Sequence, residues 1–247
     1  MLAEALRSNN KLKALDLSSN SIGPSGAHFV GLMLRHQSMI VDGMNMGGGV
    51  KTLILSDNNL RDAGVRSISQ ALENSIIECL WIDGNCISAN GLAVMADALQ
   101  RNSNLKRLHI HHNSFQSLSP LISCIFNKQN LESVADSNHT LKHVFLNCGY
   151  TYEWKELDTI LTLNRMGREE ARRQKLALYL TENPALLLQL ELDQKLLPLL
   201  LAILTLTDNI SATFHVMRNM PSEVLFFQGI NTESHVIEEF MDVEYLS

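Results

Sequence analysis

The chain has 247 residues, which fits one or two domains, and its 45% hydrophobic and 19% charged residues are ordinary for a soluble globular protein. The formal net charge of -6 argues against a nucleic-acid partner held by a global basic field. The acidic excess lies in residues 151–247, where 8 Lys and Arg oppose 15 Asp and Glu. We therefore expect two regions of different kind, 1–150 and 151–247.

Four stretches share apolar residues at their first, fourth, sixth and eleventh positions and an Asn at the ninth. They are LKALDLSSNSI (12–22), VKTLILSDNNL (50–60), IECLWIDGNCI (77–87) and LKRLHIHHNSF (105–115). The pattern is the L-x-x-L-x-L-x-x-N-x-L signature of leucine-rich repeats. Each stretch should form a short strand whose apolar residues point into a shared core. These inward residues are Leu15, Leu17, Leu53, Leu55, Leu80, Ile82, Leu108 and Ile110. The Asn should satisfy backbone groups of a recurrent turn.

The segments between the strands show helical spacing, as in 61–75, where Val65, Ile68 and Leu72 share one face. An Ala-Leu pair recurs late in several units, and the strand starts at 50, 77 and 105 lie 27 and 28 residues apart. Together these features resemble the ribonuclease-inhibitor-like subfamily of leucine-rich repeats. The resemblance implies an α/β solenoid shaped as a horseshoe, with a parallel sheet on the concave side and helices on the convex side.

Two segments depart from the repeat. The first interval is 38 residues (12 to 50), and its glycines predict a loop-like insertion at 37–49. After the fourth copy the pattern weakens, and we expect one or two degenerate units, at 131–141 and 141–149. The first of these would start a strand 26 residues after 105, with Asn138 one place early. Such weakened units are expected where a solenoid is capped.

Residues 151–247 show no repeat and predict helices that cover the last strand as an α-helical cap. Two helices should be broken near Gly167, a Leu-rich one should bend at Pro198, and a further one should end before Pro221. The region resembles the C-terminal extension of many leucine-rich-repeat proteins of unicellular algae. The tail 231–247 has five acids and no Lys or Arg, which fits either a solvated end or a peptide that docks on a partner.

Three histidines crowd into four positions at His109, His111 and His112. Strand alternation places His109 and His111 on the concave surface and His112 at the turn. A solvated histidine patch is the favoured interpretation, and a role in protein binding comes second. A metal site is the weakest of the three, because Asp83 on the neighbouring strand is the only near candidate for a further ligand.

The same alternation predicts an exposed apolar and aromatic column on the concave face. The column contains Ile54, Trp81 and His109, followed by Ala135 or Phe145 in the weakened units. Trp and Arg are enriched among interface hot spots. The candidate protein-binding residues are Ile54, Trp81, Asp83, Arg107, His109, His111 and Phe145.

The sequence contains no G-x-S-x-G, H-E-x-x-H or Rossmann fingerprint. We therefore predict a non-catalytic protein–protein interaction module with no cofactor and no bound metal, whose partners are proteins or a large complex. The alternative is a structural accessory subunit docked in a larger assembly through its ends and C-terminal helices. The chain opens on a repeat's helix without its strand (2–10), which favours that alternative.

The expected location is intracellular, in the cytoplasm or an organelle. The four cysteines, Cys79, Cys86, Cys124 and Cys148, form no C-x-x-C pair and suggest no disulfide framework. The N-terminus lacks the apolar core of a signal peptide. The most apolar run, 196–206, is shorter than the roughly 20 residues that a spanning helix needs.

Overall fold

The computed structural model describes residues 6, 9, 11–37, 40–41, 44–45, 49–146 and 152–183. Contacts divide the chain into two compact units, Met1–Lys175 and Leu176–Ser247, and the fold below is that of the first unit. The predicted Leu-rich helix, the helix before Pro221 and the acidic tail lie outside the described residues. Most of the opening half unit at 2–10 does so too.

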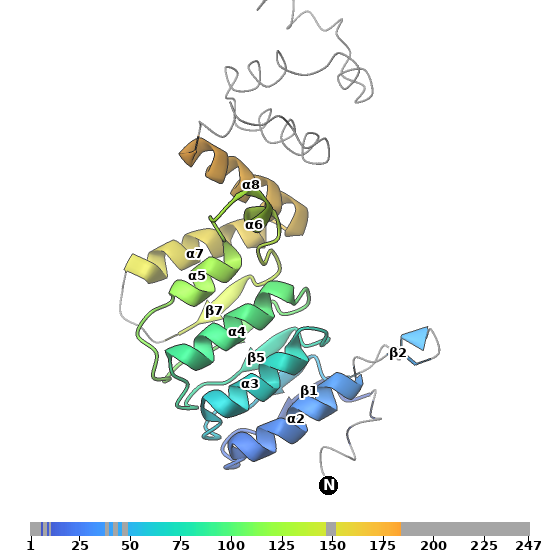
Figure 1. Ribbon diagram of the computed structural model, residues 1–247. Coiled ribbons are helices and arrows are strands. Elements are labelled where there is room, and N and C mark those ends of the chain that lie inside the picture. The colour runs from blue at the N-terminus through green and yellow to red at the C-terminus, as the bar shows by residue number, and fades with distance from the viewer. Residues whose placement is uncertain are drawn as a thin grey trace, which may run out of the picture. The chain divides into compact units, whose positions relative to one another are not determined.

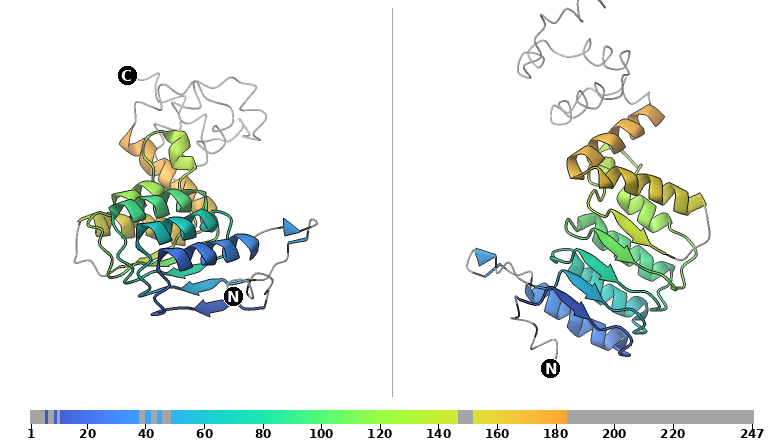
Figure 2. Two further views of the ribbon diagram at one scale, coloured as in Figure 1. Left: turned by 60° about the horizontal axis from the view of Figure 1, so that its bottom comes forward. Right: turned by 180° about the vertical axis from the view of Figure 1, so that it is seen from behind.

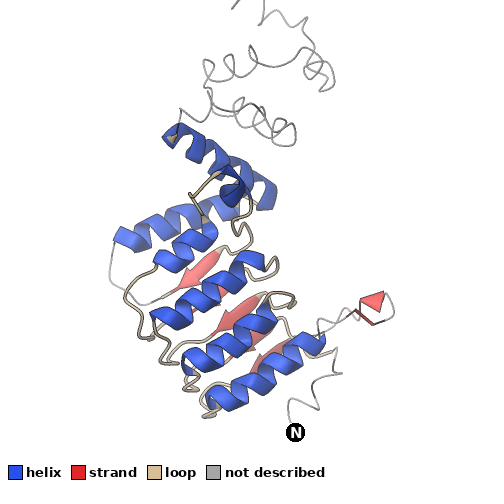
Figure 3. Cartoon of the chain, viewed as in Figure 1, coloured by secondary structure: helices blue, strands red, loops and turns tan. Residues whose placement is uncertain are grey.

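Five strands form a parallel sheet in the order β1-β4-β5-β6-β7. They are β1 (Ala14–Asp16), β4 (Thr52–Ile54), β5 (Cys79–Trp81), β6 (Arg107–His109) and β7 (His143–Phe145). The helices between them are α2 (Gly23–Gln37), α3 (Arg61–Leu72), α4 (Ala89–Arg101), α5 (Ser119–Ile125) and α6 (Leu131–Ala135). Figure 1 shows α2 to α5 stacked over one face of the sheet, and the view from behind in Figure 2 shows the other face without helices. This arrangement of strands and helices is the predicted repeat solenoid (Figure 3).

The core lies between the sheet and the helices, as the repeat predicts. The inward residues of the three middle strands are at most 1% exposed: Leu53, Leu55, Leu80, Ile82, Leu108 and Ile110. Leu15 and Leu17 are only half-buried, because β1 is the edge strand of the sheet. Stacked units bury an apolar face that one unit alone leaves in water.

The asparagines at the ninth repeat position form a ladder along the turns that follow the strands. The Asn85 side-chain oxygen accepts hydrogen bonds from the backbone N–H groups of Asn58 and Leu60 (3.0 and 3.2 Å). Its amide group donates to the carbonyls of Leu55 and Asp83 (both 2.9 Å). Asn58 repeats this pattern toward the previous unit. The ladder confirms the predicted role of the Asn in a recurrent turn.

The residue before each ladder Asn has a left-handed backbone in the last three repeats. The φ angles are 57° at Asp57, 62° at Gly84 and 51° at His112. His112 is therefore a turn residue, as the repeat predicts. Glycine adopts this conformation at Gly84 without strain, and a Cβ there would press on the end of the Asp57 side chain.

The prediction of a strand beginning at 131 was wrong. That segment forms helix α6, which the Asn130 side chain caps by accepting from the Ser133 N–H (2.8 Å). The next strand is β7, in the stretch that starts at 141, so the interval from 105 is 36 residues. Ala135 is buried in α6 and is not part of the column. Phe145 follows His109 in the column instead.

Asn138 is not a displaced ladder residue. Its side-chain oxygen accepts from the Thr140 and Leu141 N–H groups, at the turn that leads into β7. Asn102 does the same for Asn104 and Leu105 ahead of β6. A second recurrent Asn, three residues before the first apolar residue of the repeat, therefore caps the turn from helix to strand.

The predicted insertion at 37–49 is not only loop. Within its described residues, β2 (Ile40–Val41) pairs antiparallel with β3 (Met44–Asn45). After the sheet, α7 (Tyr152–Arg165) contacts α5, and α8 (Arg168–Glu182) follows. The predicted break at Gly167 is confirmed, since this residue lies between the two helices with φ at 110°.

Candidate protein-binding surface

The helix-free face of the sheet, called the open face below, carries the predicted column in register. Ile54 pairs with Trp81, Trp81 with His109, and His109 with Phe145. Buried core residues precede and follow Ile54, Trp81 and His109 in the sequence, and the side chains of these core residues point toward the helices. Alternation therefore sends the four column side chains to the open face. The expected column is present, with Phe145 as its last member.

Three of the column's rings form a continuous stack. The Trp81 and His109 ring centroids are 3.7 Å apart with 11° between the planes. The His109 and Phe145 centroids are 4.1 Å apart with 13° between the planes. Phe145 is 38% exposed, while Trp81 and His109 are half-buried. The stack presents ring edges rather than ring faces to the solvent above the sheet.

Cys79 lies beneath the indole of Trp81. The two residues are two positions apart on β5, so both side chains are on the open face. The indole N–H donates to the thiol sulfur (3.2 Å), and Cys79 is only 4% exposed although no helix covers it. This contact fixes the orientation of the Trp81 ring before any partner arrives.

Arg107 and His143 lie on one side of the stack, and Asp83 and His111 on the other. Arg107 is exposed and forms no ion pair within the described part of the chain. The carboxylate of Asp83 accepts hydrogen bonds from the backbone N–H of His111 (2.6 Å) and from the Ser56 hydroxyl (3.1 Å). These bonds connect three adjacent repeats. Asp83 therefore has a structural role, and its role in binding stays a prediction.

Burial and neighbouring charges lower the pKa of two imidazoles at the stack, His109 and His143. Partial burial lowers the pKa of His109 first, Asp83 opposes this effect, and His111 and Arg107 lower the pKa further. The pKa of His143 is also lowered, by burial and then by Arg165 and Arg107. The guanidinium of Arg107 thus acts on imidazoles on two strands.

The residues that directly precede β4, β5 and β6 are charged. The Glu78 carboxylate bridges Lys51 (2.6 Å) and Lys106 (2.8 Å) on the two neighbouring repeats. Hydrogen bonds from Lys106 and then from Lys51 lower the pKa of Glu78 to about 2. One carboxylate therefore faces two ammonium groups, and the row keeps a positive excess.

The described residues contain no group of three His, Cys, Asp or Glu side chains that a metal ion would need. The ring centroids of His109 and His111 are 6.5 Å apart, and the His109 ring is held between two aromatic rings. No helix in the described ranges is long and apolar enough to cross a membrane.

Comparisons with known proteins agree with this geometry. A family model described as leucine-rich repeat matches residues 8–29 and 50–69. The solved structure of leiomodin-1 actin-binding site 2 aligns with a TM-score of 0.53 over 70% of this chain and 92% of that one, at 16% sequence identity. The fold is a leucine-rich-repeat solenoid. The rat (Rattus norvegicus) NACHT, LRR and PYD domains-containing protein 3 is 26% identical over 144 residues, which cover 50% of this chain and 14% of that protein.

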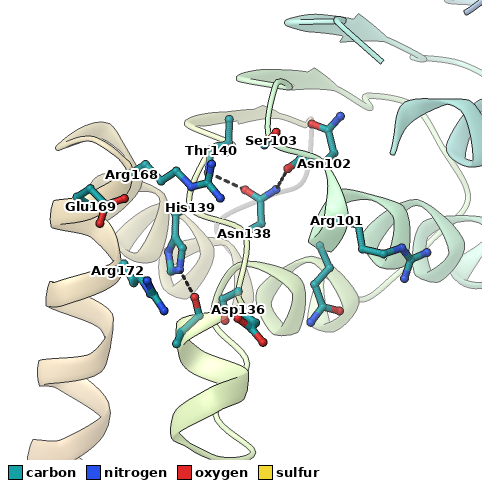
Figure 4. Close-up of a pocket in the computed structure, with 13 residues that line it drawn as sticks. Arg101, Asn102, Ser103, Asp136, Asn138, His139, Thr140, Arg168, Glu169 and Arg172 are labelled. Atoms are coloured by element: carbon teal, nitrogen blue, oxygen red, sulfur yellow. Dashed lines mark hydrogen bonds between the residues drawn. The ribbon is translucent and has the colours of Figure 1, made fainter. Parts of the chain in front are cut away.

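At the end of the leucine-rich-repeat sheet, a polar pocket of about 240 Å³ lies between α4, the turn before β7 and the start of α8. Figure 4 shows Arg168 and Arg172 beside His139 on one wall, with Asn102 and Asn138 on another. The His139 Nε2 contacts the Ala135 carbonyl (3.1 Å). Its Nδ1 is occupied as well, so the ring offers no free nitrogen to a ligand.

The partner of that Nδ1 is Lys175, which is fully buried. Its ammonium donates to the carbonyls of Ile125 (2.6 Å) and Asn138 (2.9 Å) and to the His139 Nδ1 (3.2 Å). Burial lowers the pKa of Lys175 to about 7. Sequence reasoning missed this cluster, because a lysine in a charged helix is ordinarily solvated. The ammonium holds α8 against the last repeat.

Proposed function

We propose that this chain is a non-catalytic interaction module that binds a protein partner through its open face, the concave face of the predicted horseshoe. The observation that carries the proposal is the stack of Trp81, His109 and Phe145. Leucine-rich-repeat domains generally mediate protein–protein interaction. The binding residues are Trp81, His109, Phe145 and Arg107, with Ile54 at the margin.

Two physical points support this surface. An exposed strip of aromatic and apolar side chains is seldom left bare on a soluble protein. The rings are also already ordered by their mutual stacking and by the Trp81 bond to Cys79. A partner that docks here loses little side-chain entropy in the process. His111 and Asp83 support the surface through the hydrogen bond from the His111 backbone N–H to the Asp83 carboxylate, rather than by contacting the partner.

The test compares capture of native partners by wild type, Trp81→Ala and a matched control. Phe29 is 58% exposed on α2, away from the open face, so Phe29→Ala removes an exposed aromatic ring from a different surface. We expect Trp81→Ala to weaken binding by about 2 kcal/mol or more, roughly thirtyfold in Kd. Its thermal stability should fall by only about 1 kcal/mol, the value of a lost ring pair. Undiminished binding by folded Trp81→Ala would exclude this face.

A second candidate is an accessory subunit docked in a larger assembly through the first repeat or the C-terminal helices. The exposed apolar side chains of α2 favour it, since Phe29 is 58% and Leu32 43% exposed. In that case the same experiment gives the reverse result, with binding lost in Phe29→Ala and kept in Trp81→Ala.

Three further assignments are proposed: the subfamily, the type of C-terminal extension and the location in the cell. The 27- and 28-residue spacings support the ribonuclease-inhibitor-like subfamily, and helices α7 and α8 are compatible with the algal type of C-terminal extension. The sparse cysteines support an intracellular, cytoplasmic location. Fractionation of the native cells with an antibody to the chain tests the location.

A further inference from the structure

We infer that the segment recognised by the open face is acidic: an extended protein segment that places apolar side chains on the ring stack and carboxylates on the cations beside it. This inference rests on the proposed function for the location of the site and adds the chemistry of the partner. The surface concerned, called the basic–aromatic patch below, consists of Trp81, Arg107, His109, His143 and Phe145.

The stacking geometry disfavours a basic partner. An aromatic ring attracts cations over its face, where the quadrupole is negative, and repels them at its edge. Both faces of the His109 ring are covered, one by Trp81 at 3.7 Å and the other by Phe145 at 4.1 Å. The inner faces of those two rings are covered by the same contacts. Above the stack the patch therefore offers electropositive ring edges, which favour carboxylate and carbonyl oxygens over ammonium groups, while these contacts leave the outer faces of the Trp81 and Phe145 rings uncovered.

Arg107, two residues before His109 on β6, is the cation beside the stack, and it forms no ion pair with any described residue. Further from the rings, directly before the strands, Lys51 and Lys106 share the single carboxylate of Glu78, so that row carries one positive charge in excess. A partner carboxylate would complete an arginine fork that has no partner within the described chain, and such charge-assisted bonds are strong.

The carboxylate nearest the stack does not cancel this field. Asp83 lies on the side of the column opposite Arg107 and is held by the His111 N–H and the Ser56 hydroxyl. Arg107 and the bordering acid thus lie on opposite sides of the rings. A segment that crosses the strands above the stack would place its acidic edge over Arg107.

The test uses the full chain and two short fluorescent peptides. One has Phe flanked by Glu and Asp, and its twin has Lys at every acidic position. Binding is followed by polarisation for wild type, Arg107→Glu, Trp81→Ala and the control Arg66→Glu. Arg66 is an exposed arginine on α3, outside the open face. We expect the acidic peptide alone to bind, with an affinity that falls as salt rises. Arg107→Glu should weaken it about tenfold and Arg66→Glu should not.

The outcomes separate this inference from the proposed function. Binding of the Lys peptide equal to that of the acidic one would overturn the acidic assignment, as would a failure of both to bind or no effect of Arg107→Glu. If the Lys peptide binds and Trp81→Ala abolishes it, the open face remains the binding site and only the chemistry of the partner is wrong. If the acidic peptide binds equally to Trp81→Ala and Arg107→Glu, both the inference and its location fail.

Discussion

Replacing Asn85 by Ala should destabilise the repeat unit strongly, because it removes one member of the Asn ladder. Asn85 is fully buried, and its side chain makes hydrogen bonds to four backbone groups. One of them, the Leu55 carbonyl, keeps a second donor in the Asn58 amide (3.1 Å). The Asp83 carbonyl likewise keeps the Asp57 N–H (2.8 Å), so the N–H groups of Asn58 and Leu60 are the two that lose the bonds that the Asn85 side chain provides.

Each unsatisfied buried group costs about 1–3 kcal/mol, so the lower bound for two groups gives a loss of about 2 kcal/mol. That is a large share of the roughly 5–15 kcal/mol that stabilises a typical domain. The assay is urea unfolding followed by circular dichroism. The control is Asn90→Ala in the first turn of α4, where the exposed side chain forms no hydrogen bond within the described residues. A loss within about 1 kcal/mol of that control would refute the ladder as a source of stability.

Three further changes test other parts of the unit. Burial and then the Lys175 charge lower the pKa of His139 from 6.5 to about 4, so stability present above pH 6.5 should fall by about 3 kcal/mol as the pH drops toward 4. A similar acid loss in His139→Gln, measured by urea unfolding across this range, would contradict the assignment. Gly84→Ala should cost about 1–2 kcal/mol in thermal melts, because it forces a left-handed Ala against Asp57; an unchanged melt would show that the turn relaxes. In maleimide labelling, Cys86 should react at once, whereas Cys79 should react only in Trp81→Ala. Equal labelling rates of Cys86 and Cys79 in the wild type would show that the indole does not cover the Cys79 thiol.

The repeat signature was enough to predict the strand register, since one apolar position fixes all the others in a stretch of alternating burial. Leu53 and Ile54 illustrate this: the first is buried and the second lies on the open face, as expected. The segment at 131 was misassigned because it also starts with an apolar residue and is followed by an Asn. Only the bonds made by that Asn, to Thr140 and Leu141, distinguish a turn into a strand from a turn out of one.

Side-chain partners were less accessible to sequence reasoning than register. Trp81, His109 and Phe145 were placed in one column, but their stacking depends on rotamers that a pattern of residue types does not specify. The engagement of Asp83 depends on Ser56 and His111, one on each neighbouring repeat. Lys175 reaches a carbonyl 50 positions away in the chain. Such contacts follow from tertiary packing rather than from local periodicity.

The solenoid geometry explains why His109 has a central place in the proposed surface although its imidazole is small. Neighbouring strands lie roughly 4.8 Å apart. The ring separations on both sides of His109, 3.7 and 4.1 Å, are shorter than that spacing, so Trp81 and Phe145 lean toward it. A residue without a flat ring at this position would leave two inner faces unsupported and free the outer rings to change rotamer. The order of the surface therefore depends on its middle residue, and binding strength should follow the planarity of that side chain more closely than its charge.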